Sequence, residues 1–148
     1  MSAAAPVDGT AAEGKAQRPL PTPTPESSPY WEATHEHRLV VQQCGTCGLT
    51  QFYPPRTFCR RCMSELTWIT CSGRAVVVAS STVVRAPSKA FQEDAPYNVS
   101  LVELEEGPRL ITTVVNPPAE GEVRPGASVE VVYDDVTETV TLPRFRLV

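Results

Sequence analysis

Residues 44–62 read C-G-T-C-G-L-T-Q-F-Y-P-P-R-T-F-C-R-R-C, and this stretch decides how the chain folds. It holds four of the five cysteines as two C-x-x-C pairs, Cys44 with Cys47 and Cys59 with Cys62. A C-x-x-C turn can place two thiolates on one metal ion, so two such turns can complete a tetrahedral four-cysteine shell. The spacing therefore predicts one structural zinc ion, which crosslinks two hairpin turns that are too small to fold alone.

Iron and disulfides are the alternatives for these cysteines. A rubredoxin iron site usually carries a proline inside its second C-x-x-C pair, whereas residues 59–62 read C-R-R-C. The N-terminus lacks a basic start followed by an apolar block, so we expect no secretory signal. In a reducing cytosol thiolates stay available for metal. We therefore expect zinc and a cytoplasmic location.

The composition argues against two classes of partner. The net charge is −4, whereas a general nucleic-acid binder needs a basic face to displace phosphate counterions. The sequence has no run of about 18 apolar residues, so we expect no transmembrane helix. The length suits one ordinary domain or two very small ones.

The residues before the two cysteine pairs divide into a tail and a short helix. Residues 1–28 are rich in Ala, Pro, Thr and Gly, and they bury too little apolar surface to offset the entropy of ordering. We expect a disordered tail that acts as a spacer or, alternatively, as a polyproline ligand of a partner.

A helix start follows, with Ser28 as the cap and Pro29 in the first turn, and the helix should end at about residue 37 or 38. A helix this short must dock on something. Tyr30 and Trp31 are the expected anchors, against either the ribbon or a partner protein.

The remaining pattern is β. In the ribbon we expect strands at 39–43, 49–53 and 66–70. After the break at Ser72-Gly73 we expect five strands, at 75–85, 97–103, 109–115, 129–133 and 137–142, with a turn at Asp134-Asp135. The first of these is long and should bend near Ser80, as the opening strand of an OB-fold does.

The predicted fold is mainly β. It has a short N-terminal helix with a rubredoxin-like zinc ribbon (residues 29–71), followed by a five-stranded OB-fold barrel (residues 72–148). A two-sheet sandwich of the same strands is the alternative.

The sequence offers no self-contained catalytic set, so we name no catalytic residue. Cys71 has no base nearby and is expected to be a buried structural thiol. His35 and His37 lie on different sides of the helix, which suits surface or packing roles better than one metal. In the 85–97 loop, Arg85, Lys89 and Phe91 could bind a phosphate-bearing ligand such as a CoA ester, although an ordinary exposed loop has the same composition.

The order of these segments resembles the DUF35 family. The resemblance covers roughly residues 29–148 and rests on Y-W-E in the helix, the C-G-T-C and C-R-R-C pairs, S-G-R-A-V-V-V-A-S-S-T-V-V, A-P-Y-N-V-S-L-V-E-L-E-E-G-P-R-L-I-T-T-V-V and D-V-T-E-T-V-T-L-P-R-F. It implies a rubredoxin-like zinc ribbon followed by an OB-fold, with the ribbon cysteines at Cys44, Cys47, Cys59 and Cys62.

The resemblance also implies a role. Members of the family are usually non-catalytic partners of thiolase-superfamily enzymes, both thiolases and retro-aldolases, in degradative acyl-CoA metabolism of lipids or aromatic compounds. Some accompany MaoC-like enoyl-CoA hydratases instead. We therefore expect an accessory subunit without activity alone, which forms a hetero-oligomer with a thiolase-like protein and helps to form its acyl-CoA channel. A nucleic-acid-binding module and a stand-alone redox protein are the alternatives from other classes.

Overall fold

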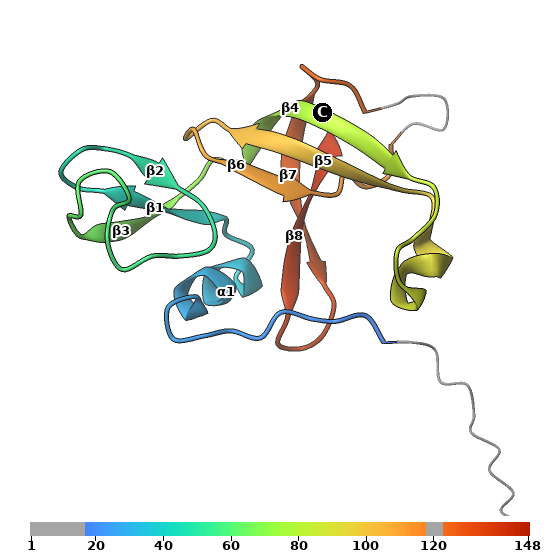
Figure 1. Cartoon of the computed structure of the whole chain (residues 1–148), viewed down its shortest axis with the longest axis horizontal. Coiled ribbons are helices and arrows are strands. Elements are labelled where there is room, and N and C mark those ends of the chain that lie inside the picture. Colours follow the sequence, from blue (N-terminus) through green and yellow to red (C-terminus); the bar gives the residue numbers. More distant parts are fainter. Residues whose placement is uncertain (1–16, 118–122) are drawn as a thin grey trace, which may run out of the picture.

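The computed structural model describes residues 17–117 and 123–148, which form two β-sheets and a short helix (Figure 1). The ribbon sheet has the order β2-β1-β3, with strands β1 (Val40–Cys44), β2 (Thr50–Gln51) and β3 (Leu66–Thr70). The second sheet has the order β6-β5-β4-β7-β8. Its strands are β4 (Arg74–Val83), β5 (Tyr97–Leu104), β6 (Arg109–Thr112), β7 (Ser128–Asp135) and β8 (Thr141–Leu147). Helix α1 spans Ser28–His35, and the 3-10 helix η1 spans Lys89–Asp94.

The five-stranded sheet closes into a barrel. The amide of Val115 donates to the carbonyl of Phe145 (2.7 Å) and the amide of Phe145 donates to the carbonyl of Thr113 (3.1 Å), so the segment after β6 runs parallel to β8. Phe145 is fully buried at this closure. Strand β4 carries a register shift between Val77 and Ala79, close to the bend expected at Ser80. The closure confirms the OB-fold barrel and disfavours the sandwich, because a sandwich has no such join.

Helix, ribbon and barrel share one core. Buried side chains from all three parts belong to the same cluster, including Tyr30 of α1, Val41 of β1, and Val102, Val129 and Phe145 of the barrel. Because none of the three parts buries its apolar face alone, the helix and the ribbon are packed parts of the fold rather than appendages. Within the described part of the chain, no helix is both long and apolar enough to cross a membrane.

The helix ends earlier than the sequence predicts. The amide of Arg38 donates to the carbonyl of Ala33 (2.8 Å) and that of His37 to Thr34 (2.9 Å), the two bonds of a Schellman motif. His37 takes the left-handed conformation with φ 56° that this motif requires, so the helix cannot continue through it. The start also differs, because Ser27 and not Ser28 precedes the first helical residue and its side chain makes no cap hydrogen bond.

The prediction for the last strand and its turn was wrong. Asp134 and Asp135 belong to β7, and the turn lies at residues 136–140, where the Thr137 hydroxyl accepts a hydrogen bond from the amide of Val140 (3.0 Å). Strand β8 then continues through Pro143, opposite Tyr133. Proline fits there because its nitrogen, like the amide of Phe145 two residues later, faces away from β7, so no hydrogen bond of the β7–β8 ladder is lost.

Residues 17–27 lie along the barrel instead of forming a free tail. Arg18 forms an ion pair with Asp94 of η1, and Ser27 is buried next to a turn in which its hydroxyl accepts the amide hydrogen of Thr24 (2.8 Å). Figure 1 shows this segment running below α1 and across the tip of the β7–β8 hairpin. The disordered tail expected at residues 1–28 stays a prediction, and residues 1–16 lie outside the described part of the chain. The division into units at 28–29 and 71–72 stays a prediction.

Candidate metal centre and apolar groove

Each C-x-x-C pair lies in a tight turn of the same construction. In the first, the amide of Gly48 donates to the carbonyl of Cys44 (3.0 Å), and in the second the amide of Met63 donates to that of Cys59 (2.9 Å). Gly48 and Met63 both have left-handed backbones, with φ 71° and 62°. Glycine adopts this conformation freely, whereas a methionine there is strained, so the second turn is held in shape by its surroundings.

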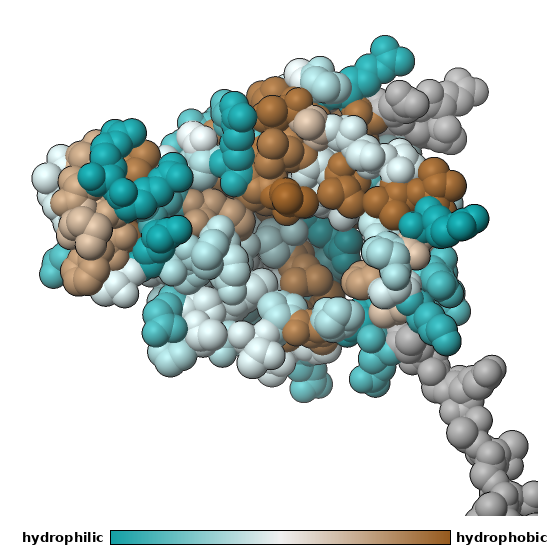
Figure 2. All heavy atoms as spheres, viewed as in Figure 1, coloured by the Kyte–Doolittle hydropathy of each residue, from teal (hydrophilic) through white to brown (hydrophobic). Residues whose placement is uncertain are grey.

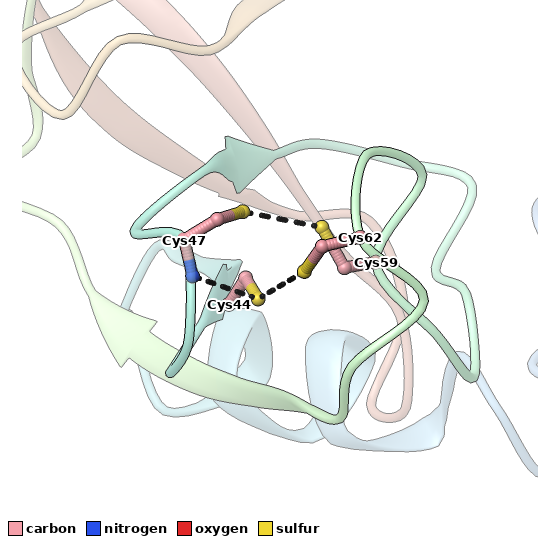
Figure 3. A group of neighbouring side chains, drawn as sticks. All are labelled: Cys44, Cys47, Cys59 and Cys62. Carbon is pink, nitrogen blue, oxygen red and sulfur yellow. Dashed lines mark hydrogen bonds between the residues drawn. The ribbon is translucent and has the colours of Figure 1, made fainter.

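The four thiols converge on one point (Figure 3). The sulfurs of Cys44 and Cys62 lie 3.5 Å apart, those of Cys47 and Cys59 lie 3.6 Å apart, and all four sulfurs lie within 4.8 Å of one another. A tetrahedron with zinc–sulfur bonds of about 2.3 Å has sulfur–sulfur edges of about 3.8 Å. A disulfide would bring two sulfurs to about 2.05 Å, so none is formed here. The cysteines are therefore positioned to bind one metal ion.

Backbone amides prepare two of the thiols for ionisation. Hydrogen bonds from the hydroxyl and the amide of Ser64 lower the pKa of Cys62 to about 6, and the amides of Arg61 and Cys62 lower the pKa of Cys59. At Cys47 the amide of Leu49 acts in the same direction, but burial and the neighbouring sulfurs outweigh it and raise the pKa to about 11. Four thiolates this close repel each other, and a divalent cation is what stabilises them together.

The other candidate ligands lie away from this centre. Cys71 is buried, and its burial, followed by the charge of Glu106, raises its pKa to about 12. His37 stacks on Tyr133 (4.8 Å between ring centroids) and its Nε2 lies 3.0 Å from a carboxylate oxygen of Asp135. Both have packing or surface roles in this structure, as the sequence indicated.

An apolar groove of about 440 Å³ lies between the exposed side of α1, the ribbon and the barrel. Figure 2 shows a hollow in this region, with apolar side chains gathered along the barrel strands beside it. The groove is lined mainly by aromatic and aliphatic side chains, among them Trp31, Tyr53, Phe91, Val99, Leu110 and Ile111. A second cavity of about 300 Å³ shares Phe91, Leu142 and Arg144 with the groove and reaches the segment that contains Arg18 and Leu20.

The structure separates the three residues predicted to bind a CoA ester. Phe91 is half-buried and lines both cavities, with its ring 6.4 Å from that of Tyr97. Arg85 and Lys89 are exposed and line neither cavity. The cation that lines both is Arg144, whose Nε donates to Asp134 (2.9 Å). Sequence reasoning missed Arg144 because the expected last strand ends at Leu142, although the alternation in P-R-F-R-L after that point is a strand signal.

The two expected anchors on the helix differ in exposure. Tyr30 is 4% exposed, and its ring contacts those of Phe52 (5.7 Å) and Tyr53 (5.6 Å), so it docks the helix on the ribbon. Trp31 is half-buried and lines the groove, and its indole N–H is buried without a partner among the described residues. Of the two, only Trp31 is placed where another molecule could reach it.

Two family models match this architecture. The ChsH2 rubredoxin-like zinc ribbon domain matches residues 31–67, and the C-terminal OB-fold domain of ChsH2 matches residues 68–134. The first match agrees with the four-cysteine geometry and identifies the metal centre as a zinc site.

Curated proteins and a solved structure are similar to the chain over most of its length. A DUF35 domain-containing scaffold protein of Methanocaldococcus jannaschii is 36% identical over 102 residues, which cover 68% of this chain and 70% of that protein. A probable enoyl-CoA hydratase alpha subunit of Thermomonospora curvata is 34% identical over 133 residues, 89% of this chain but only 40% of the relative. A structure named Ltp2-ChsH2(DUF35) aldolase aligns with a TM-score of 0.72 and 32% identity, covering 86% of this chain and 98% of that one.

Proposed function

The chain belongs to the DUF35 family, with a ChsH2-type zinc ribbon followed by an OB-fold, and from this premise we propose that it is a non-catalytic accessory subunit of a thiolase-superfamily enzyme. The enzyme would be a thiolase or a retro-aldolase that acts on acyl-CoA substrates. The proposal includes a cytoplasmic location, where thiolates remain reduced for zinc.

The observation that carries the proposal is the likeness to the chain in the Ltp2-ChsH2(DUF35) aldolase structure. The likeness extends over nearly the whole of both chains, so the ribbon, the barrel and their arrangement are matched together and not one module alone. The name of that structure pairs a DUF35 chain with a second protein. A chain that matches it throughout is suited to the same kind of assembly.

The residues of this chain fit a supporting role. In the metal centre four thiolates fill a tetrahedral shell, which leaves no open position for water or substrate. Cys71 keeps its proton at neutral pH because burial raises its pKa, so it is a poor nucleophile. The nucleophile and the acid or base of the reaction would therefore come from the partner subunit.

The apolar groove is the surface proposed to meet the partner. Ile111 is 75% exposed at its edge, and Trp31 lies within it. An exposed aliphatic side chain beside a half-buried tryptophan is typical of a surface that is covered in a complex. A second subunit laid over the groove would enclose a channel with apolar walls, which suits the acyl part of a CoA ester.

A MaoC-like enoyl-CoA hydratase is the second candidate partner. It is favoured by the similarity to the probable enoyl-CoA hydratase alpha subunit, of which this chain matches 40%. The chain spans only 40% of that relative's length, so the hydratase activity in the relative's name reaches this chain only as part of the proposal. The two candidates differ in which enzyme forms a stable heteromer with this chain.

Co-expression tests the proposal. The chain is expressed with the thiolase-like protein or with the MaoC-like protein encoded nearest to its gene, and the heteromer is measured by size-exclusion chromatography with light scattering. We expect a stable complex with the thiolase-like protein and acyl-CoA activity that neither protein has alone. A thiolase-like protein that is soluble, fully active and unbound would refute the proposal.

Two matched variants locate the interface. Ile111→Asp places a charge in the groove, whereas Val148→Asp places one at a site of similar exposure (81%) outside the groove lining. Neither side chain is buried, so both variants should fold. We expect Ile111→Asp to weaken the heteromer at least about tenfold and Val148→Asp to leave it unchanged. Equal behaviour of the two would place the interface elsewhere.

A further inference from the structure

A cavity of about 590 Å³ lies where the ribbon meets the barrel. One wall is the ribbon segment 49–54, and the opposite wall is the turn between β5 and β6 at residues 107–109, which reaches toward β2 in Figure 1. Arg56 and Arg60 complete the lining from the loop that leads to the second zinc turn. This cavity is separate from the 85–97 loop and from the apolar groove, with which it shares only the aromatic residues Phe52 and Tyr53.

Positive charge collects around this cavity in a chain whose net charge is −4. Three arginines line it, and residues 39–64 contain no aspartate or glutamate. Arg109 is paired with Glu103 (2.6 Å), but Arg56 and Arg60 form no ion pair within residues 17–117 and 123–148. Two guanidinium groups without an acid partner beside a cavity are available to an anion.

The positions of these walls are fixed by buried hydrogen bonds. The amide of Arg56 donates to Oε1 of Gln42 (2.8 Å), and Nε2 of Gln42 donates back to the carbonyl of Arg56 (2.8 Å). Gln42 is 6% exposed. Across the cavity, the hydroxyl of Thr50 donates to the carbonyl of Glu106 (2.8 Å) and ties the ribbon to the β5–β6 turn. A cavity whose walls are fixed before binding loses little entropy when a ligand enters.

The remaining lining suits a flat ring. Tyr53 is 44% exposed, and its ring is held by contacts with Tyr30 (5.6 Å) and Trp31 (6.1 Å). An aromatic face and two guanidinium groups without an ion-pair partner among the described residues together match a ring and phosphates.

We propose that this cavity binds a nucleotide, with Arg56 and Arg60 contacting its phosphate groups and Tyr53 contacting its base. The proposal goes beyond the accessory role, because the site lies within this chain and needs no partner protein. Its competitor is a purely structural role, in which Arg60 balances the charge of the zinc centre: four thiolates and one Zn²⁺ sum to about −2 (2 − 4). Arg56 lies outside the C-x-x-C turns, so it separates the two explanations.

The test is calorimetric titration of the zinc-loaded full chain with ADP, inorganic pyrophosphate and adenosine. ADP should bind most tightly, since it alone offers both phosphates and base. Arg56→Gln and Arg60→Gln should each weaken ADP binding about tenfold, the effect expected for losing one charge-assisted hydrogen bond. The control Arg124→Gln removes an exposed arginine that does not line the cavity and should leave binding unchanged.

Other outcomes overturn the proposal. Absence of ADP binding at millimolar concentration would refute it, as would ADP binding that Arg56→Gln leaves intact. Pyrophosphate binding as tight as ADP binding would refute contact with the base. Zinc content and the unfolding midpoint of each variant show whether it folds, and loss of zinc in Arg60→Gln with unaltered ADP binding in Arg56→Gln would establish the structural role instead. Because no partner is present, failure here leaves the accessory function standing.

Discussion

Replacing Gly73 by alanine should destabilise the junction between ribbon and barrel. Gly73 has φ +84°, a conformation that side chains rarely adopt, and a Cβ at this position would lie 2.6 Å from Cγ1 of Val131 on β7. The two backbones are held together, since the amide of Val131 donates to the carbonyl of Gly73 (2.8 Å). The two backbones therefore cannot move apart to relieve the clash without breaking that hydrogen bond.

The magnitude follows from two separate costs. A left-handed backbone costs a residue with a Cβ about 1–2 kcal/mol. Overpacking by one methyl group against a stiff β-branched side chain costs about a further 1–3 kcal/mol. We therefore expect Gly73→Ala to lower the free energy of unfolding by about 2–5 kcal/mol. That is a large share of the stability of a small domain, which is typically about 5–15 kcal/mol.

Gly126 supplies the matched control. It has φ +88°, nearly the same backbone, but no heavy atom lies within 4 Å of the position that a Cβ would take there. Gly126→Ala should cost only the backbone share, about 1–2 kcal/mol. Gly45 has neither feature, so Gly45→Ala should change stability by less than about 0.5 kcal/mol. Urea denaturation at saturating zinc measures all three variants.

A double variant isolates the clash. In Gly73→Ala with Val131→Ala the Cγ1 atom is removed, so the overpacking cost should disappear while the backbone cost remains. The coupling energy between the two substitutions should then be about 1–3 kcal/mol. Equal losses in Gly73→Ala and Gly126→Ala would refute the packing argument, and a loss below about 0.5 kcal/mol in Gly73→Ala would refute the conformational one as well.

Substitutions at three further positions test the zinc centre and the core. Cys59→Ser should release zinc and unfold the ribbon, because metal binding on the order of 10 kcal/mol is folding energy there; a variant that retains one zinc per chain by mass spectrometry would contradict this. Tyr30→Ala should cost about 3–5 kcal/mol in urea denaturation, and Tyr30→Phe far less, because the ring is 4% exposed. The pKa of Cys71 is raised to about 12 by burial, so its unfolded form ionises near pH 9 while the folded form keeps its proton. Stability should therefore fall as the pH rises above about 9, and Cys71→Ala should reduce that fall; an unaltered pH profile would count against the burial argument.

The zinc ribbon could be predicted from sequence because its constraint is local. Two cysteines separated by two residues fix a turn, and the pairing of the two turns is then set by the metal. Strand β3 has the predicted bounds, since L-T-W-I-T is a short run of strand-forming residues between Cys62 and the break at Gly73. In each case a pattern of few residues decides the structure without information from the rest of the chain.

The C-terminal hairpin could not be predicted in the same way. T-E-T-V-T has the composition of a strand, but hydroxyl groups can also bond neighbouring amides, as Thr137 does with Val140. Pro143 argues against a strand unless its nitrogen faces away from the paired strand. Which way it faces depends on the register between β7 and β8, which is a tertiary fact. The bounds of this hairpin are therefore decided by how the strands pair in the sheet and not by local strand propensity.

The candidate site residues also divide into those that a local sequence pattern identifies and those that only the packing of the fold brings together. The four cysteines all lie within residues 44–62, and the sequence alone identified them. Arg144 and Trp31 line one groove although they lie far apart in the sequence, and Arg56 lines one cavity with the β5–β6 turn only because the ribbon packs on the barrel. No spacing rule connects such residues, since their proximity arises from the packing of separate elements.

The packing of ribbon on barrel assigns the zinc ion a role beyond the ribbon itself. The Thr50 hydroxyl donates to the carbonyl of Glu106 (2.8 Å) and the Ser72 amide donates to its carboxylate (2.7 Å), so the β5–β6 turn is fastened to the ribbon at Thr50 and to the link between β3 and β4 at Ser72. Tyr30 and Phe52 extend this contact into the common core. Zinc fixes the ribbon, the ribbon fixes one wall of the arginine-lined cavity, and the helix on the ribbon fixes one wall of the groove. Loss of the metal should therefore remove both surfaces at once, although none of the four cysteines lines either of them.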